Sequence, residues 1–518
     1  MAKVNVDNKH PLYEKNAAIW QRARDCYEGS DAVKARGVAY LPALSSHHKE
    51  GGAQQYRAYL LRAMFYNATG RTVDGMAGGL FQKDPSIEMP SYAEQDMQDV
   101  TLTGQPAEQA ALIAAREVLT VGRYGILVDT NEERPYWAPY LAEDIINWKV
   151  ERVAGSPKLT LLVLRERTEM PSEDPFAHQT VTRLMVFQMF EGACLRSAWL
   201  IDPSKQEPVE VEPPTPLLRR GQVLDFIPFV FMGAVNIDPM PDRPPLLDLI
   251  DLNLSHYRTS ADLEHGRHFT ALPQPWIAGV APVDGDDPLS IGAGGVWVLG
   301  PDGKAGMLEF TGQGLTALRE AEQDKRKMMA TLGARLLDEP GGEETATAVI
   351  GRHAGEHATL RTIAQVLEQA LTRVMKIHAW WAAGSTKAKP EDEDAAFELN
   401  KDFFAVKMSS QDLQALVAAL QADSISYETF WFNLVRGGVG RPVSAEEELE
   451  AIAARTQESE TPGAEGASEG GGYKIVRKDG AYLVVDTNGQ VVPGGDHGTD
   501  QKAATAHLAA LAATEGEE

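Results

Sequence analysis

The stretch PPLLDLIDLNLSHYRTSADLEHGRHF (residues 244–269) predicts one long helix that begins at a proline pair. Leu246, Ile250, Leu254 and Tyr257 recur at spacings of three and four residues, so they share one helical face.

A compact insert, residues 271–312, separates this helix from a second long helix predicted over 313–335. The insert contains turn-forming Gly, Asp and Pro residues and one predicted strand, VWVL (296–299). An acidic stretch broken by glycines, 336–348, leads into a third long helix over 349–383. A lone chain gains little by projecting two helices with a small tip, whereas neighbouring helices in a ring of copies pack side by side.

The region before residue 244 predicts helices first and strands later. A helix is expected over Gln54–Asp74 and another over 106–120, followed by a buried strand at 124–129. Residues 136–235 are mostly β, with β-branched and aromatic runs between turns. Within them EPVEVEPPTP (207–216) is too rich in proline for a central strand and predicts an exposed loop.

The region after residue 383 predicts short elements. They are a charged connector (384–407) with a strand near 403–408, helices within 409–455, a flexible linker (456–472), and a hairpin with a short helix (473–518). Together the segments predict an α+β fold.

Composition bounds the function. The chain has 518 residues, a mass of 56.4 kDa and a formal net charge of −25, which fits about three or four domains at ~100–200 residues each. General nucleic-acid binding draws its strength from Lys and Arg, so the acidic balance argues against tight binding of this kind.

Three further features bear on location and chemistry. Cys26 and Cys194 stand alone, outside any CxxC pair, so neither a disulfide framework nor a structural zinc site is expected. The N-terminus is polar, and no apolar stretch approaches the ~18 residues of a membrane span. We therefore expect a protein that is made and folds in a reducing cytoplasm, with no membrane partner.

Two short motifs that look catalytic also have structural explanations. His353-Ala-Gly-Glu356-His357 fits the H-x-x-E-H zinc pattern, but a polar helix face explains it as well. The G-x-S-x-G match at 466–470 lies in the predicted linker, where no nucleophile elbow forms. No P-loop motif occurs. We expect no enzyme activity and no cofactor, and a zinc metallopeptidase remains a remote alternative.

Charged clusters on the predicted helices are also ambiguous. The predicted helix 244–270 contains four residues that can bind metals: His256, Glu264, His265 and His268. Helical spacing favours a simple Glu264–His268 pair, and a metal site is a minor alternative. The cluster Lys325-Arg326-Lys327 is read first as a solvated helix face, with phosphate contact as the alternative.

The sequence resembles a portal protein of a tailed bacteriophage, most strongly a portal-like subgroup described as a domain of unknown function. The resemblance spans about residues 12–385. It rests on Tyr56–Tyr59, Arg62-Ala63, Asn67–Thr72, Gly122–Asp129, Glu143–Trp148, Pro228–Val230, Pro244–Asp248, Asn253–Tyr257 and Ala261-Asp262.

The resemblance implies a ring at one capsid vertex, usually of about twelve copies. It divides the chain into a wing (1–243 with 384–407), stem helices (244–270 and 313–335), a clip (271–312), a tunnel loop (336–348), a long wing helix (349–383) and a crown (409–455). The segment 473–518 would be a small additional domain.

The resemblance also implies a function without chemistry of its own. The ring would conduct double-stranded DNA during packaging and ejection. It would dock the terminase and a tail adaptor through the clip, and would contact the major capsid and scaffold proteins. The chain would lie in the virion, and in the host cytoplasm during assembly. Another minor head or connector protein is the nearest alternative.

Candidate functional residues follow from these parts. The implied tunnel loop holds Asp338, Glu339, Pro340, Gly341, Gly342, Glu343 and Glu344, whose acids would form a collar that guides DNA without gripping it. Lys325, Arg326 and Lys327 would face DNA or pair with acids on a neighbouring stem helix. The implied clip contacts are Trp276, Trp297 and Lys304.

Overall fold

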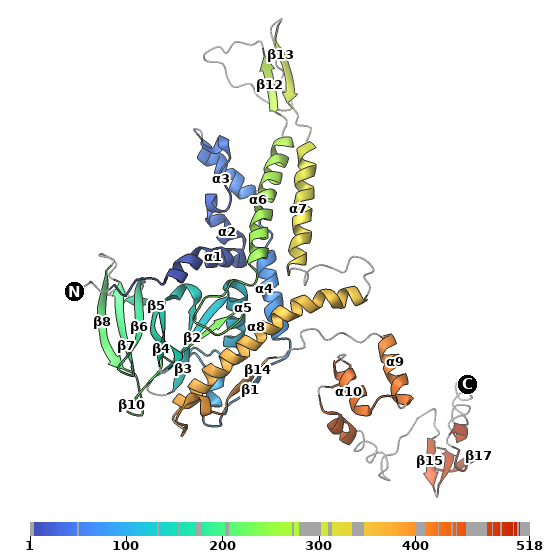
Figure 1. The fold of residues 1–518 in the computed structure, drawn as a ribbon. Helices are drawn as coiled ribbons and strands as arrows, with labels where there is room; N and C mark the ends of the chain where they lie inside the picture. Colours follow the sequence, from blue (N-terminus) through green and yellow to red (C-terminus); the bar gives the residue numbers. More distant parts are fainter. Residues whose placement is uncertain are drawn as a thin grey trace. The chain divides into compact units, whose positions relative to one another are not determined.

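The computed structural model divides the chain into two compact units, residues 1–404 and 405–518, and each is described by itself. The fold is α+β, as the sequence predicts (Figure 1). The structure describes residues 5–48, 51–131, 134–153, 155–170, 176, 178–201, 207–271, 274–278, 302–308, 313–333, 346–399, 410–422, 424–436, 439–441, 443–451, 474–478, 480–486, 489–500, 502–504 and 507.

The first unit begins with helices. The long ones have clear end signals, since α1 starts with a proline behind the capping side chain of His10, and α5 ends at Gly122 with φ 72°. The helices are α1 (Pro11–Glu28), α2 (Ser30–Ala35), α3 (Gly52–Arg62), α4 (Ala68–Leu80) and α5 (Ala107–Val121), with 3-10 turns η1 (Gly37–Ala39), η2 (Ser45–His48), η3 (Gln95–Gln98) and η4 (Ala142–Asp144).

The single helix predicted over Gln54–Asp74 is wrong, because the chain breaks between α3 and α4. Asn67 explains the break. Its side chain accepts a hydrogen bond from the backbone nitrogen of Gly70, 2.8 Å away, and so caps a new helix. The break lets α3 and α4 take separate places beside the long helix that follows.

Two larger sheets form the β part of the first unit. In a three-stranded sheet, β2 (Arg123–Thr130) lies between β11 (Phe229–Gly233) and β3 (Pro135–Leu141). The predicted buried strand at 124–129 is confirmed. The other sheet is an antiparallel meander of β4 (Ile145–Val153), β5 (Ser156–Met170), β6 (Gln179–Phe190), β7 (Ala193–Ile201) and β8 (Pro208–Pro216).

The loop predicted over 207–216 is also wrong, because this segment is the edge strand β8. Its prolines remain compatible with a strand because an edge strand has one side without a ladder partner, where a missing N–H costs nothing. Short strand pairs complete the unit: β1 (Ser86–Glu88) with β14 (Ala396–Glu398), and β9 (Leu218–Arg219) with β10 (Gln222–Val223).

The core of the first unit is one continuous apolar cluster that joins helices and sheets. Helix α8 (Ala346–Trp381) packs against α5, β2 and β11 through its second half, and Leu367, Leu371 and Val374 are fully buried there. At about 1.5–3 kcal/mol per buried large apolar side chain, this cluster holds the unit together.

Helices α6 (Leu247–Thr270) and α7 (Gln313–Thr331) confirm the long helices predicted on either side of the insert. Within the insert, β12 (Gln274–Ala278) pairs with β13 (Lys304–Leu308). The predicted strand 296–299 lies outside the described residues. Helix α8 begins at Ala346, three residues earlier than predicted, and η6 (Pro390–Asp392) follows it.

The second unit holds helices and one small sheet. Helices α9 (Ser410–Gln421) and α10 (Tyr427–Arg436) and a helical turn over 445–451 lie where helices are predicted. The predicted hairpin is the first half of a three-stranded sheet of β15 (Lys474–Lys478), β16 (Ala481–Val485) and β17 (Val491–Asp496). The predicted strand at 403–408 and linker at 456–472 lie outside the described residues.

No helix in the described part of the chain combines the length and the apolar character that crossing a membrane requires.

Candidate functional site: the paired helices α6 and α7

Helices α6 and α7 form an antiparallel pair. Near one end, Gly266 faces Leu315, where a Cβ on Gly266 would meet Leu315 Cδ2 at 2.6 Å. Towards the other end, Lys325 Nζ donates hydrogen bonds to the Ser255 carbonyl, 3.1 Å away, and to Thr259 Oγ1. The glycine permits close packing where the helices lead into the insert, and the lysine bonds the pair further along.

A buried polar cluster joins the same two helices. His256 is fully buried, and its Nε2 lies 3.5 Å from Glu322 Oε1 and 3.3 Å from Arg326 Nε. Arg326 in turn donates to Glu322 at 3.1 Å. Burial lowers the pKa of His256 to about 4, with Arg326 and Lys325 lowering it further and Glu322 opposing them. His256 is therefore neutral at pH 7, and the Glu322–Arg326 pair carries the charge.

The aromatic ring of Tyr66 connects this cluster to the chain just before α4. The Arg326 guanidinium lies 5.4 Å from the Tyr66 ring centroid, and the Arg71 guanidinium lies 5.5 Å from it. Cation–π contacts of this length stabilise a partly exposed site by about 0.5–1 kcal/mol each. Arg326 thus contacts α6, α7 and the α4 region at once.

Asn253 anchors α6 to the start of α4. Its Oδ1 accepts hydrogen bonds from the backbone nitrogen of Thr69 (3.1 Å) and from Thr69 Oγ1 (2.9 Å), and its Nδ2 donates to the Tyr66 carbonyl (2.7 Å). Asn253 and Thr69 are fully buried. A buried amide with all these bonds made fixes both the position and the rotation of α6.

Helix α3 covers a further side of α6. Tyr59 Oη donates to Asp262 Oδ1 at 2.6 Å, and Arg62 lies 2.9 Å from the Nε2 of His268. The predicted Glu264–His268 pair is wrong, because Glu264 pairs instead with Arg267 at 2.6 Å. Arg267 and His268 both lie about one helical turn from Glu264, so either could pair with it. His268 instead lies beside Arg62 of α3.

The β12–β13 ribbon follows α6 and precedes α7, so the chain places it at the end of the pair where Gly266 faces Leu315 (Figure 1). Trp276 pairs across the ribbon with Gly306 and is 43% exposed. Lys304 opposes Ala278 and is also exposed. Of the implied clip contacts, Trp297 lies outside the described residues.

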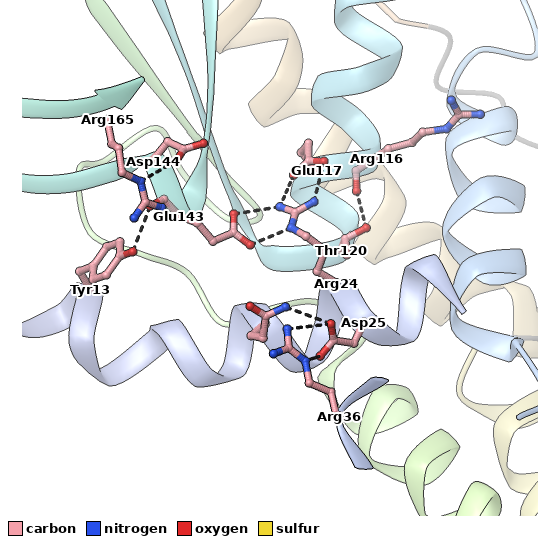
Figure 2. Close-up of polar contacts among 11 residues, drawn as sticks. Tyr13, Arg24, Asp25, Arg36, Arg116, Glu117, Thr120, Glu143, Asp144 and Arg165 are labelled. Atoms are coloured by element: carbon pink, nitrogen blue, oxygen red, sulfur yellow. Dashed lines mark hydrogen bonds and ion pairs between the residues drawn. The ribbon is translucent and has the colours of Figure 1, made fainter. Parts of the chain in front are cut away.

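Helix α1 links α6 to α5 and to the turn η4. Arg22 on α1 pairs with Asp251 on α6 at 3.1 Å. Further along α1, Arg24 donates to both carboxylates of Glu117 and Glu143, which come from α5 and η4 (Figure 2). Burial alone would lower the pKa of Arg24, but the hydrogen bonds that it donates to the two glutamates raise it above its ordinary value.

The predicted basic cluster is divided rather than presented on one face. Lys325 and Arg326 bond to α6 and to Glu322, while the Lys327 side chain is 81% exposed and lies 4.0 Å from Asp324. The tunnel-loop residues 338–344 lie outside the described residues. Asn253, Tyr66 and Glu322 are site residues that were not predicted from the sequence, although a polar Asn253 inside an apolar helical face was a signal for it.

The described residues bear on the metal sites considered from the sequence. Among these, no group of three or more His, Cys, Asp or Glu side chains could hold a metal ion. His256 contacts Glu322 on α7, while His265 packs its ring against Tyr59 and Phe269. The H-x-x-E-H match at 353–357 falls in the first part of α8, whose side chains lie outside the described residues.

Comparison with known proteins gives one sequence match and several structural ones. Residues 245–382, which include α6, the ribbon and α7, match a family model described as a domain of unknown function (DUF4055). No curated protein matches the sequence.

Three of the matching solved structures come from gene transfer agent (GTA) particles. A chain from the neck of an empty GTA particle, computed with C6 symmetry, is 14% identical with a TM-score of 0.37, over 74% of this chain and 93% of that chain. A chain from the virion of a native particle is 13% identical with a TM-score of 0.36, over 75% and 94%. A chain from the native neck, computed with C12 symmetry, is 14% identical with a TM-score of 0.36, over 74% and 93%. At these low scores the likeness carries no argument about function.

Proposed function

We propose that this chain is a head-to-tail structural protein of a phage-like particle, and specifically a portal protein. Copies would form a ring at one capsid vertex, and double-stranded DNA would pass through its centre during packaging and ejection. The helices α6 and α7 would line the stem, the insert would form the clip that docks the terminase and the tail adaptor, and residues 336–348 would form the tunnel loop.

The main support for this proposal is the arrangement of α6 and α7. These two long antiparallel helices lead to the small β12–β13 ribbon, and buried polar contacts fix them to the rest of the first unit. Asn253, His256 and Glu322 are buried. Asn253 bonds to Thr69 at the start of α4, and His256 on α6 accepts a bond from Arg326 on α7, which also donates to Glu322. Buried polar contacts of this kind specify one arrangement of the helices. A stem that must align with its neighbours in a ring needs this fixed arrangement.

The charge of the chain supports a conduit over a DNA-gripping protein. The formal net charge is −25, and of the three adjacent basic residues of α7 only Lys327 is largely free of α6. Strong phosphate binding along a channel wall would oppose sliding, because each phosphate contact releases counterions and adds affinity. An acidic ring would guide DNA by exclusion.

Co-expression with the capsid, scaffold and terminase genes of the same genome tests this function. Particles formed with the chain should contain nuclease-protected DNA and carry a ring at one vertex in electron micrographs. Particles formed without the chain should remain free of protected DNA. Protected DNA at equal levels in both preparations would contradict the proposal and favour another minor head or connector role.

A further inference from the structure

An exposed apolar patch lies on the outer side of α3. Leu61 is 70% exposed, Met64 is 51% exposed and Val38 is 62% exposed. Lys34 Nζ donates to the Leu61 carbonyl at 3.3 Å, which holds the α2–η1 segment beside α3. Arg57 is exposed one helical turn before Leu61. We call these five residues the α3 patch, which is apolar at its centre and basic at its edge.

A second exposed apolar patch lies on α7. Met328 is 56% exposed and Leu332 is 44% exposed, and the two are four residues apart. Glu320 and Asp324 are exposed on the preceding turns, and the Asp324 side chain is 66% exposed. We call these four residues the α7 patch, which is apolar with an acidic edge. The side chain of Lys327 lies 4.0 Å from Asp324.

Helix α6 separates the two patches. Helix α3 contacts α6 through Asp262 and His268, whereas α7 contacts it through Ser255 and Thr259 (Figure 1). Figure 1 shows α3 and α7 flanking α6, so the two patches lie on separate helices of the first unit. A ring built from identical copies uses two such different surfaces at every contact, one from each neighbour.

We propose that the α3 patch of one copy packs against the α7 patch of the next copy. This inference rests on the ring of the proposed function and names the surfaces that close it. The contact would bury Leu61 and Met64 against Met328 and Leu332, and would place the basic edge opposite the acidic edge. Burial of apolar area supplies the attraction, and the charges select the pairing of unlike patches over like ones.

Cysteine cross-linking tests the pairing directly. The chain carries Leu61→Cys and Met328→Cys together, and its native Cys26 and Cys194 are buried and do not interfere. Mild oxidation of assembled protein should give a ladder of covalent oligomers on a non-reducing gel. A mixture of the two single variants should stop at dimers, and each single variant alone should stay monomeric on the gel.

Charge reversal provides an independent test of the contact between the α3 patch and the α7 patch. Arg57→Glu should raise the concentration needed for half-assembly by about two- to fivefold, the range expected for exposed ion pairs. Adding Asp324→Arg in the same chain should restore assembly. Lys158→Glu reverses an exposed charge near the start of β5 and serves as the matched control. All substituted positions are exposed, and equal melting temperatures of the variants confirm that folding is intact.

The outcomes separate the two proposals. Rings from the unmodified chain together with no ladder from the double-cysteine variant would overturn the inference and leave the proposed function standing. Cross-linked dimers from Leu61→Cys alone would also overturn it, because they require like patches to meet. Failure of the unmodified chain to form rings, alone and with its capsid proteins, would overturn both.

Discussion

Lys325 on α7 donates a hydrogen bond from Nζ to the backbone carbonyl of Ser255 on α6, 3.1 Å away. The same carbonyl also accepts a hydrogen bond from Thr259 Oγ1 at 3.2 Å, and Lys325 Nζ donates to that hydroxyl as well. Burial lowers the pKa of Lys325 from its ordinary value, with Arg258 adding to the shift. A lysine that the basic cluster suggested for DNA or for a neighbouring copy therefore fastens the two helices of its own chain.

Removing the Lys325 ammonium should loosen α7 from α6. Lys325→Met keeps the length of the side chain and loses both hydrogen bonds, which should cost about 1–2 kcal/mol of unfolding free energy. Hydrogen exchange of the α7 amides should accelerate. Lys327→Met, at a position 81% exposed, is the control and should change neither quantity measurably. Equal exchange in the two variants would contradict the role given to Lys325.

Asn253 should be the most sensitive polar residue of α6. Asn253→Leu has a similar size but leaves the Thr69 and Tyr66 backbone groups without their partner, so we expect a loss of about 1–3 kcal/mol. Thermal unfolding measures the effect. Asp248→Ala removes an exposed residue of the same helix, 70% exposed, and should leave the melting temperature nearly unchanged. A neutral Asn253→Leu would show that the anchor does not stabilise α6.

His256 should make the protein less stable in acid. Its pKa is about 4 in the folded chain against an ordinary value of 6.5, so the unfolded chain binds its proton first. This contribution to stability is complete above pH 6.5 and is lost as the pH falls towards 4. The melting temperature should therefore drop over that window, and the drop should be smaller in His256→Gln. An unchanged pH profile in the variant would contradict the burial of a neutral imidazole.

Loss of the Arg24 network should lower the free energy of unfolding more than loss of an exposed ion pair does. Arg24→Met leaves Glu117 and Glu143 close together without their cation, which should cost at least about 2 kcal/mol. Arg116→Met removes a pair with Asp74 whose side chains are 40% and 54% exposed, and should cost under about 1 kcal/mol. Denaturant unfolding compares the two variants. A larger loss at Arg116 would reverse this ranking.

The long helices and the buried strand could be predicted from the sequence because their apolar periodicity is strong. Ile250, Leu254 and Tyr257 form one face of α6 in the pattern and are buried in the structure. The predictions failed where a local structure depends on contacts that the sequence pattern does not show. The break before α4 depends on the Asn67 cap, and the β8 segment becomes a strand only because β7 lies beside it.

The partners inside the site could not be predicted for the same physical reason. A histidine pattern on α6 does not reveal that Glu322 and Arg326 meet His256, because those residues are about 70 positions away in sequence. The basic run of α7 likewise suggested one solvated face. The structure divides it, since helical geometry turns Lys325 towards α6 and Lys327 towards solvent.

The mass of the purified 518-residue chain, measured by mass photometry with negative-stain images of the same sample, tests whether the copies form a ring. We expect rings with a central hole and a mass near twelve times the 56.4 kDa of one chain, or a near multiple. A species of 56.4 kDa that stays monomeric even with its capsid and scaffold proteins would contradict it. A monomer that also carries one zinc ion per chain would favour the metallopeptidase alternative instead.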